Sequence, residues 1–232
     1  MKYLNFLLLP TFTCLSLVAC DTQTEPQKKT GFIIANDDSG VLSEPDRARD
    51  LKLTMLAQLK DLRTKRNYAK AKLKVISSSF GRSVFVGSIE DLSSNRAENI
   101  VSKMESNSTY CNRLPETFES VRSSIKQLEQ QGYEDIYVYF FSSLISTPSV
   151  CVDKQRVELP QLPVPVNFSN TLTSSDAVSA ISFYYVNPHN FKAYQEALQP
   201  VATWANENNK SFQIFDMEDT AYQLRTGLLG VK

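Results

Sequence analysis

Residues 30–43 read Thr-Gly-Phe-Ile-Ile-Ala-Asn-Asp-Asp-Ser-Gly-Val-Leu-Ser, and this stretch decides the fold. Its apolar run, Phe32 to Ala35, is short, continuous and bounded by turn residues, which is typical of a strand buried in a parallel sheet. A proline and acidic residues follow Ser43, as at the start of a helix. Loops at the carboxyl ends of strands bind ligands in open α/β sheets. We therefore expect a partner-binding site formed by Asp37, Asp38, Ser39 and Ser43.

The rest of the chain alternates predicted strands with predicted helices. Further strands are predicted at residues 72–78, 83–89, 135–141, 177–186 and 211–215. Helices are predicted from Ser43 onward and at residues 90–105, 115–131, 187–208 and 218–228. Gly81 separates the second and third strands and predicts a hairpin. This order predicts an α/β fold with three layers, in which a largely parallel, doubly wound sheet has one antiparallel edge strand.

The first twenty residues have the pattern of a secretory signal. Lys2 is basic, and the apolar segment that follows is too short for a spanning helix with matching flanks. The end of this segment, Leu17-Val18-Ala19-Cys20, resembles a bacterial lipobox. That resemblance implies cleavage before Cys20 and attachment of palmitate-like acyl chains to it, which anchor a protein stably. An ordinary secretory signal and an uncleaved anchor are the alternatives.

This signal sets the expected domains and the expected location. Residues 1–19 form the signal peptide, residues 20–30 the lipidated cysteine with a polar tether, and residues 31–232 one α/β domain. We expect the protein in the bacterial cell envelope, lipid-anchored and facing the periplasm. Asp21 follows the anchor, as in lipoproteins retained in the inner membrane, which favours that membrane over the outer one. The net charge is +0, which gives no reason to expect nucleic acid as a partner.

The cysteines predict one disulfide. Cys14 leaves with the signal and Cys20 is lipidated, so Cys111 and Cys151 remain as an even pair in an oxidising compartment. Two free thiols or a metal pair are the alternatives. The chain has 1 histidine, so a Cys/His zinc site has few ligands to use.

The loop after the first strand resembles the metal-ion-dependent adhesion motif of von Willebrand factor A-type domains, which reads Asp-x-Ser-x-Ser. Asp37, Ser39 and Gly40 match, whereas Val41 replaces the second serine. The order of strands and helices is also similar to that family over residues 31–228. The resemblance implies a divalent cation held by three loops, with an open position for a carboxylate of a partner protein.

The expected ligands of that cation are only partly present. Asp37, Ser39 and Thr109 offer the oxygen ligands that Mg²⁺ and Ca²⁺ prefer. The third loop carries Ser142 and Ser143 where the family has an aspartate. We therefore expect no cofactor, and a degenerate motif that caps a helix; a Mg²⁺ or Ca²⁺ site is the alternative.

The sequence predicts a binding protein and not an enzyme. His189 follows Pro188 at a predicted helix start, which is typical of an exposed polar residue and not of a catalytic base. The main interpretation is a membrane-anchored lipoprotein whose domain binds another protein as a scaffold or in adhesion. The alternatives are metal-dependent adhesion through the Asp37 loop, or a structural part of an envelope or secretion assembly.

Two further segments carry alternative interpretations. The irregular, proline-bearing residues 144–173 form a long loop, which either docks on a partner or only connects two elements. The first helix has a basic side, which is either solvated or in contact with anionic lipid or an acidic partner. Its cations are Arg47, Arg49, Lys52, Lys60, Arg63, Lys65 and Arg66.

Overall fold

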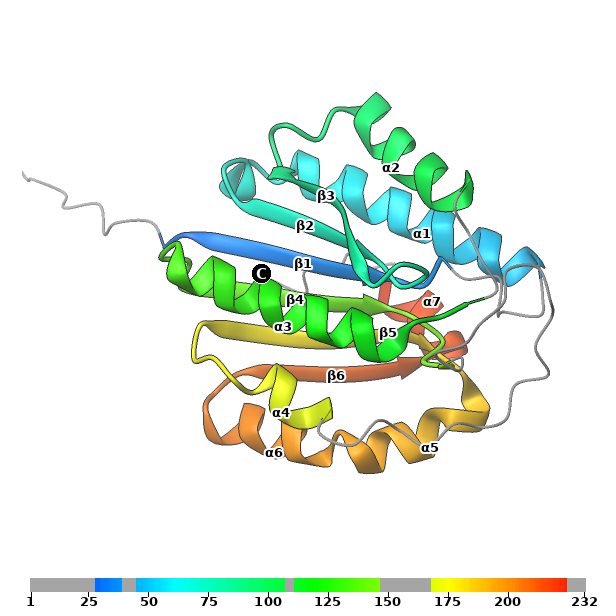
Figure 1. The fold of residues 1–232 in the computed structure, drawn as a ribbon, viewed down its shortest axis with the longest axis vertical. Coiled ribbons are helices and arrows are strands. Elements are labelled where there is room, and N and C mark those ends of the chain that lie inside the picture. The colour runs from blue at the N-terminus through cyan, green and yellow to red at the C-terminus, as the bar shows by residue number, and fades with distance from the viewer. Residues whose placement is uncertain (1–27, 39–44, 107–110, 147–167, 225–232) are drawn as a thin grey trace, which may run out of the picture.

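The chain folds around one six-stranded sheet (Figure 1). The computed structural model describes residues 28–38, 45–106, 111–146 and 168–224. The strand order is β3-β2-β1-β4-β5-β6. The strands are β1 (Thr30–Asn36), β2 (Lys72–Ser77), β3 (Arg82–Ser88), β4 (Asp135–Phe141), β5 (Val178–Val186) and β6 (Ser211–Asp216).

All neighbouring strands run parallel except β2 and β3, so β3 is an antiparallel edge strand. The hairpin between them confirms the prediction made from Gly81. This glycine has φ 59, a left-handed conformation that side chains disfavour. A Cβ there would also lie 2.6 Å from Cβ of Glu116. The turn therefore requires glycine for both its backbone conformation and its close packing.

Helices cover both faces of the sheet (Figure 1). The α-helices are α1 (Pro45–Thr64), α2 (Ser94–Ser106), α3 (Leu114–Gln130), α4 (Phe168–Leu172), α5 (Pro188–Ala197), α6 (Gln199–Glu207) and α7 (Met217–Gln223), and a short 3-10 helix, η1, spans Arg66–Tyr68. Helices α1 and α2 pack on one face, and α3 and α6 pack on the other. This confirms an α/β fold with a mixed sheet between helical layers.

Strand β1 shows why the pattern of the opening stretch predicts a central strand. Phe32 and Ile34 belong to the core on the α1 and α2 side, whereas Ile33 and Ala35 belong to the core on the α3 side. All four side chains are buried. Because side chains alternate along a strand, a strand covered on both faces needs apolar residues at every position.

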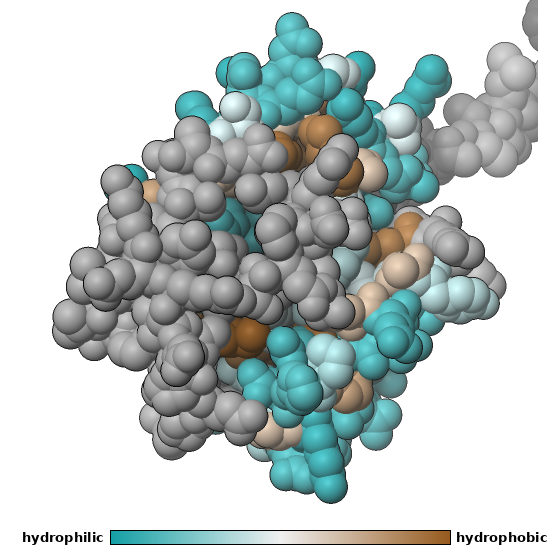
Figure 2. Space-filling view, turned by 90° about the vertical axis from the view of Figure 1, so that its right-hand side faces the viewer, coloured by the Kyte–Doolittle hydropathy of each residue, from teal (hydrophilic) through white to brown (hydrophobic). Residues whose placement is uncertain are grey.

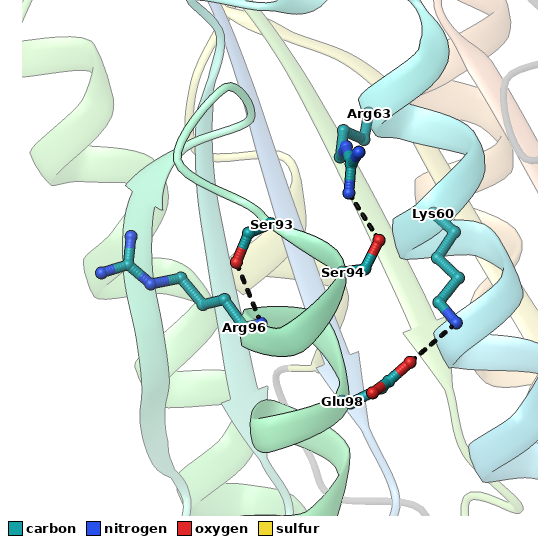
Figure 3. Close-up of polar contacts among 6 residues, drawn as sticks. All are labelled: Lys60, Arg63, Ser93, Ser94, Arg96 and Glu98. Atoms are coloured by element: carbon teal, nitrogen blue, oxygen red, sulfur yellow. Dashed lines mark hydrogen bonds and ion pairs between the residues drawn. The ribbon is translucent and has the colours of Figure 1, made fainter.

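Two predicted helices differ from the structure. Residues 187–208 form two helices, α5 and α6, because Pro200 has no N–H to continue the helical ladder across Leu198. Helix α2 begins at Ser94 and not at residue 90, since Ser93 caps it by accepting a hydrogen bond from the backbone N–H of Arg96 (3.1 Å; Figure 3).

Polar contacts join α1 to α2 (Figure 3). Lys60 Nζ lies 3.1 Å from Glu98 Oε1, and Arg63 Nη1 donates to Ser94 Oγ at 2.7 Å. These two members of the basic side of α1 therefore contact a neighbouring helix. The side chains of Arg47, Arg49 and Lys52 lie outside the described part of the chain.

None of the helices in the described ranges is both long enough and apolar enough to cross a membrane.

Candidate functional site

The candidate site lies where the direction of strand addition changes. Strand β1 is the first strand of the chain, and it lies between β2 on one side and β4 on the other. The carboxyl ends of these three parallel strands meet at one edge of the sheet, at the right of Figure 1. Loops at such a switch point diverge, which leaves a crevice where α/β proteins bind ligands. We call this the carboxyl edge.

Asp37 is the centre of a buried hydrogen-bond network at the carboxyl edge. Its Oδ2 accepts from Ser143 Oγ (2.8 Å), Asn112 Nδ2 (3.0 Å) and Ser142 Oγ (3.3 Å). Its Oδ1 accepts from Ser78 Oγ (3.3 Å). These donors come from the ends of β2 and β4 and from the segment before α3. One carboxylate therefore joins three loops that are far apart in the sequence.

Asp38 extends the network toward β2. Its Oδ2 accepts from Ser77 Oγ at 2.6 Å, and its Oδ1 accepts from the backbone N–H of Ser79 at 2.9 Å. Burial is the main cause that raises the pKa of Asp38, and the neighbouring Asp37 carboxylate adds to the rise. The bonds from Ser77 and Ser79 oppose it by stabilising the charged form.

Backbone hydrogen bonds hold the same loops together beyond the strands. Asp37 N donates to Phe141 O (2.7 Å), Ser78 N to Asn36 O (3.0 Å), and Arg113 N to Ser78 O (2.9 Å). The chain therefore stays paired past the last residues of β1 and β2. Pairing of this kind restricts the motion of the loops, and a preorganised surface loses less entropy when it binds.

Leu144 shows backbone strain next to this network. It has φ 56, which is a left-handed conformation and an outlier for a bulky residue. Its buried side chain belongs to the α3-side core, and its N–H donates to Ser142 Oγ at 3.1 Å. Packing and this bond hold the turn, so Ser142 and Ser143 are directed toward Asp37. Such conformations cost about 1–3 kcal/mol and cluster at functional sites.

The sequence predicted some members of this site and missed others. Asp37 and Asp38 lie at the carboxyl edge, as expected, but both are buried and engaged inside the protein. Ser39, Ser43 and Thr109 lie outside the described residues, so their predicted roles stay predictions. The residues missed as network members are Ser77, Ser78, Asn112, Ser142 and Ser143. The serines could have been found, since Ser77 and Ser78 end one predicted strand and Ser142 and Ser143 follow another.

The predicted cation site is not tested by the structure. Across the described ranges, no group of three or more His, Cys, Asp or Glu residues could hold a metal ion. The two carboxylates and the serine hydroxyls are nevertheless hard oxygen ligands of the kind that Mg²⁺ and Ca²⁺ take. The carboxyl group of Asp37 accepts hydrogen bonds from four side chains in this arrangement.

Three cysteines and a histidine are the other residues that the sequence singles out. Cys111 is buried and disulfide-bonded, but Cys151 lies outside the described residues, so their pairing stays a prediction. Cys20 lies outside them as well. His189 is exposed in the first turn of α5, where its backbone N–H donates to Oδ1 of the capping residue Asn187 at 2.9 Å. This is the position expected for a polar residue at a helix start.

Figure 2 views the molecule from the side of the carboxyl edge. The described side chains on this face are mostly hydrophilic, and the hydrophobic ones form small separate patches.

Comparisons with known proteins support the fold alone. No family model matches the chain, and no curated protein matches it. Among solved structures, the PilB minor pilin from Streptococcus sanguinis has a TM-score of 0.55 at 10% identity, covering 87% of this chain and 60% of that chain. Its D319A mutant has a TM-score of 0.54 at 11% identity, with 88% and 61% covered.

The pilus adhesin SpaC from Lactobacillus rhamnosus GG, in its open conformation, has a TM-score of 0.52 at 12% identity, covering 86% of this chain and 29% of that one. The chain thus spans less than two thirds of the length of each of these proteins.

These findings correct the predicted family. The identification of a von Willebrand factor A-type domain was wrong, because no family model matches and the similar structures are a minor pilin and a pilus adhesin. The resemblance rested on the order of strands and helices, which unrelated α/β folds can share, and on Asp37, Ser39 and Gly40, a short pattern that buried polar networks at strand ends also produce. In this chain Asp37 serves such a network.

Proposed function

We propose that this protein is a lipid-anchored component of the bacterial cell envelope that binds another protein through its carboxyl edge, without a metal. The observation that carries this proposal is the buried Asp37 network, which holds the ends of β1, β2 and β4 and the segment before α3 in one arrangement. Internal hydrogen bonds of this kind fix the shape of a surface. They contribute no chemistry that would mark a catalytic centre.

The structural neighbours support the same class of function. A minor pilin and a pilus adhesin share the fold, and both names describe components of pili. A role as a scaffold or structural part of an envelope or secretion assembly follows from the same likeness. The signal ending in Cys20 supports an anchor, and Asp21 supports the inner membrane.

Site-specific photo-crosslinking in intact cells tests the binding face. A photoreactive residue at Arg113 or Ile145 lies beside the network, since Ile145 O accepts from Asn112 Nδ2 at 2.7 Å. Glu90 and Gln131 provide matched controls at the opposite edge. We expect discrete adducts from the first pair and none of the same size from the second. Identical adducts from both pairs, or none from the first pair, would refute the proposed face.

Fractionation tests the anchor separately. In the Cys20→Ser variant, the protein should leave the membrane fraction and appear in the soluble periplasm. Asp21→Ser should move the lipidated protein toward the outer membrane in a density gradient. If Cys20→Ser stays in the membrane fraction, the proposed lipid anchor is refuted, whatever the crosslinking experiment shows.

A metal-dependent form of the same binding is the second candidate. The observation in its favour is the pair of carboxylates beside serine hydroxyls at one edge. Calorimetric titration with Mg²⁺, Ca²⁺ and Mn²⁺ tests it, with Asp37→Asn as the matched variant. A binding heat that the native chain shows and Asp37→Asn lacks would support a cation site. If the native chain shows no binding heat at millimolar metal, this candidate is excluded.

A further inference from the structure

A cleft opens at the edge of the sheet opposite the carboxyl edge. Its volume is about 420 Å³. Thr30, Ala71 and Tyr133 lie at or just before the amino ends of β1, β2 and β4, and each contributes to the wall. The other lining residues are Lys28, Lys29, Arg66, Asn67, Ala69 and Lys70. We call this the amino-edge cleft.

The amino-edge cleft is basic. Lys28, Lys29, Arg66 and Lys70 are exposed, and none of the described residues that line the cleft is acidic. Within the described ranges, none of these four cations forms an ion pair. Lys29 Nζ donates only to the backbone oxygen of Gln131, at 3.4 Å. The cleft therefore holds four positive charges that are available to an anion.

The acids closest in the sequence to this cleft are Glu134 and Asp135, which follow Tyr133. Asp135 accepts a hydrogen bond from the hydroxyl of Tyr137 at 3.0 Å, and Glu134 is exposed. Neither lines the cleft. Other cations of the basic side of the first helix are engaged. Lys60 and Arg63 contact α2 (Figure 3). Lys65 lies 3.9 Å from Asp61.

The position of the cleft relative to the expected anchor identifies its partner. Eight residues lead from Cys20 to Lys28, so a fully extended chain spans at most about 28 Å. A flexible chain of that length typically spans about 16 Å. If Cys20 is lipidated, as proposed above, the four cations lie close to the headgroup layer at all times. Anionic headgroups attract cations that approach within a Debye length, about 8 Å at physiological salt.

We propose that the amino-edge cleft binds the phosphate groups of anionic phospholipid headgroups and docks the domain on the membrane that carries its anchor. Docking in this way gives the domain a defined orientation. Strand β1 has 7 residues and runs from the cleft to the carboxyl edge. At about 3.3 Å per residue, it holds the carboxyl edge about 23 Å farther from the lipid surface. The binding face then points away from the membrane.

Vesicle flotation of the purified chain from residue 21 onward tests this proposal without the lipid anchor. The probes are vesicles of phosphatidylcholine alone and vesicles that contain about 30% phosphatidylglycerol, which approximates an anionic membrane leaflet. The variant carries Lys28→Gln, Arg66→Gln and Lys70→Gln. The control carries Arg82→Gln, Lys103→Gln and Lys192→Gln, which remove the same charge from exposed positions outside the cleft.

We expect binding only to the anionic vesicles, reduced about 100-fold by the cleft variant and much less by the control variant. Equal losses in both variants would overturn the proposal, because they indicate attraction by overall charge. Binding of soluble glycerol phosphate without binding to vesicles would also overturn it, because the cleft would then be a small-anion site. Since Cys20 is absent from this protein, a negative result is distinct from failure of the anchor.

Discussion

Replacing Asp37 with alanine removes the acceptor on which the carboxyl edge depends. Two hydrogen bonds to its carboxylate have good distances, those from Ser143 Oγ (2.8 Å) and Asn112 Nδ2 (3.0 Å). A bond to a charged acceptor contributes about 1.5 kcal/mol or more. The two bonds at 3.3 Å add little, and Asn112 keeps its bond to Ile145 O. The free energy of unfolding should therefore fall by about 3 kcal/mol.

Asparagine at position 37 provides the matched variant. It keeps the size of the side chain, and its one oxygen can face Ser142, Ser143 and Asn112 in place of Oδ2. The hydroxyl of Ser78 can rotate to accept from the new amide. Only the charge is lost, so the free energy of unfolding should fall by about 1 kcal/mol.

Urea unfolding measures both effects. Trp204 is the only tryptophan of the chain and lies in α6, away from the network, so its fluorescence reports global unfolding. With a slope of about 2 kcal/mol per molar urea, the midpoint should fall by about 1.5 M for Asp37→Ala and about 0.5 M for Asp37→Asn. Asp176→Ala, at an exposed carboxylate, should change it by less than about 0.25 M.

The urea midpoints of these variants test whether the Asp37 carboxylate holds the loops together. If Asp37→Ala has the same midpoint as the native chain, or a higher one, the carboxylate does not hold the loops, and its burial costs as much as its hydrogen bonds contribute. The preorganised face inferred from the network would then have no energetic basis.

Three further predictions concern the pH dependence, the hairpin and the disulfide. Because the folded-state pKa of Asp38 lies above 3.8, its contribution to stability is greatest at low pH and is lost as the pH rises through the folded pKa. The stability of Asp38→Asn relative to the native chain should therefore increase from pH 4 to pH 7 in urea titrations; a constant difference contradicts this. Gly81→Ala should cost about 2–3 kcal/mol, because it adds a clash to a left-handed backbone, whereas Gly132→Ala, with φ 77 and only Lys29 Nζ within 4 Å, at 3.9 Å, should cost about 1 kcal/mol. Thermal melts compare the two, and equal costs would exclude the clash. Reduction should slow the chain on a denaturing gel, and the Cys151→Ala variant should lack this shift if Cys111 pairs with Cys151; a persisting shift would indicate another pairing.

The sequence predicted the types of element well, because the signals for them are local. A continuous apolar run predicted β1, and Gly81 between two apolar runs predicted the hairpin of β2 and β3. The break between α5 and α6 was missed even though Pro200 is visible in the sequence, since the apolar spacing continues across it. Periodicity detects which face of a segment is buried, but it does not detect a missing N–H.

The family resemblance, which rested on the order of strands and helices and on one loop, failed for a related reason. Asp37, Ser39 and Gly40 form a short pattern, and short polar patterns after a strand arise wherever a loop needs internal acceptors. A pattern of three residues contains no information about the donors that the rest of the chain brings to it.

By itself, the sequence determined that β1 is a buried strand and that Asp37 and Asp38 follow its carboxyl end, because both facts depend on neighbours in the chain. Only the tertiary structure decided which groups meet those carboxylates. Ser143 is 106 residues from Asp37, and Lys28, Arg66 and Tyr133 share one cleft. These contacts depend on β1 lying between β2 and β4, and strand order is set by packing of the whole sheet and not by local sequence.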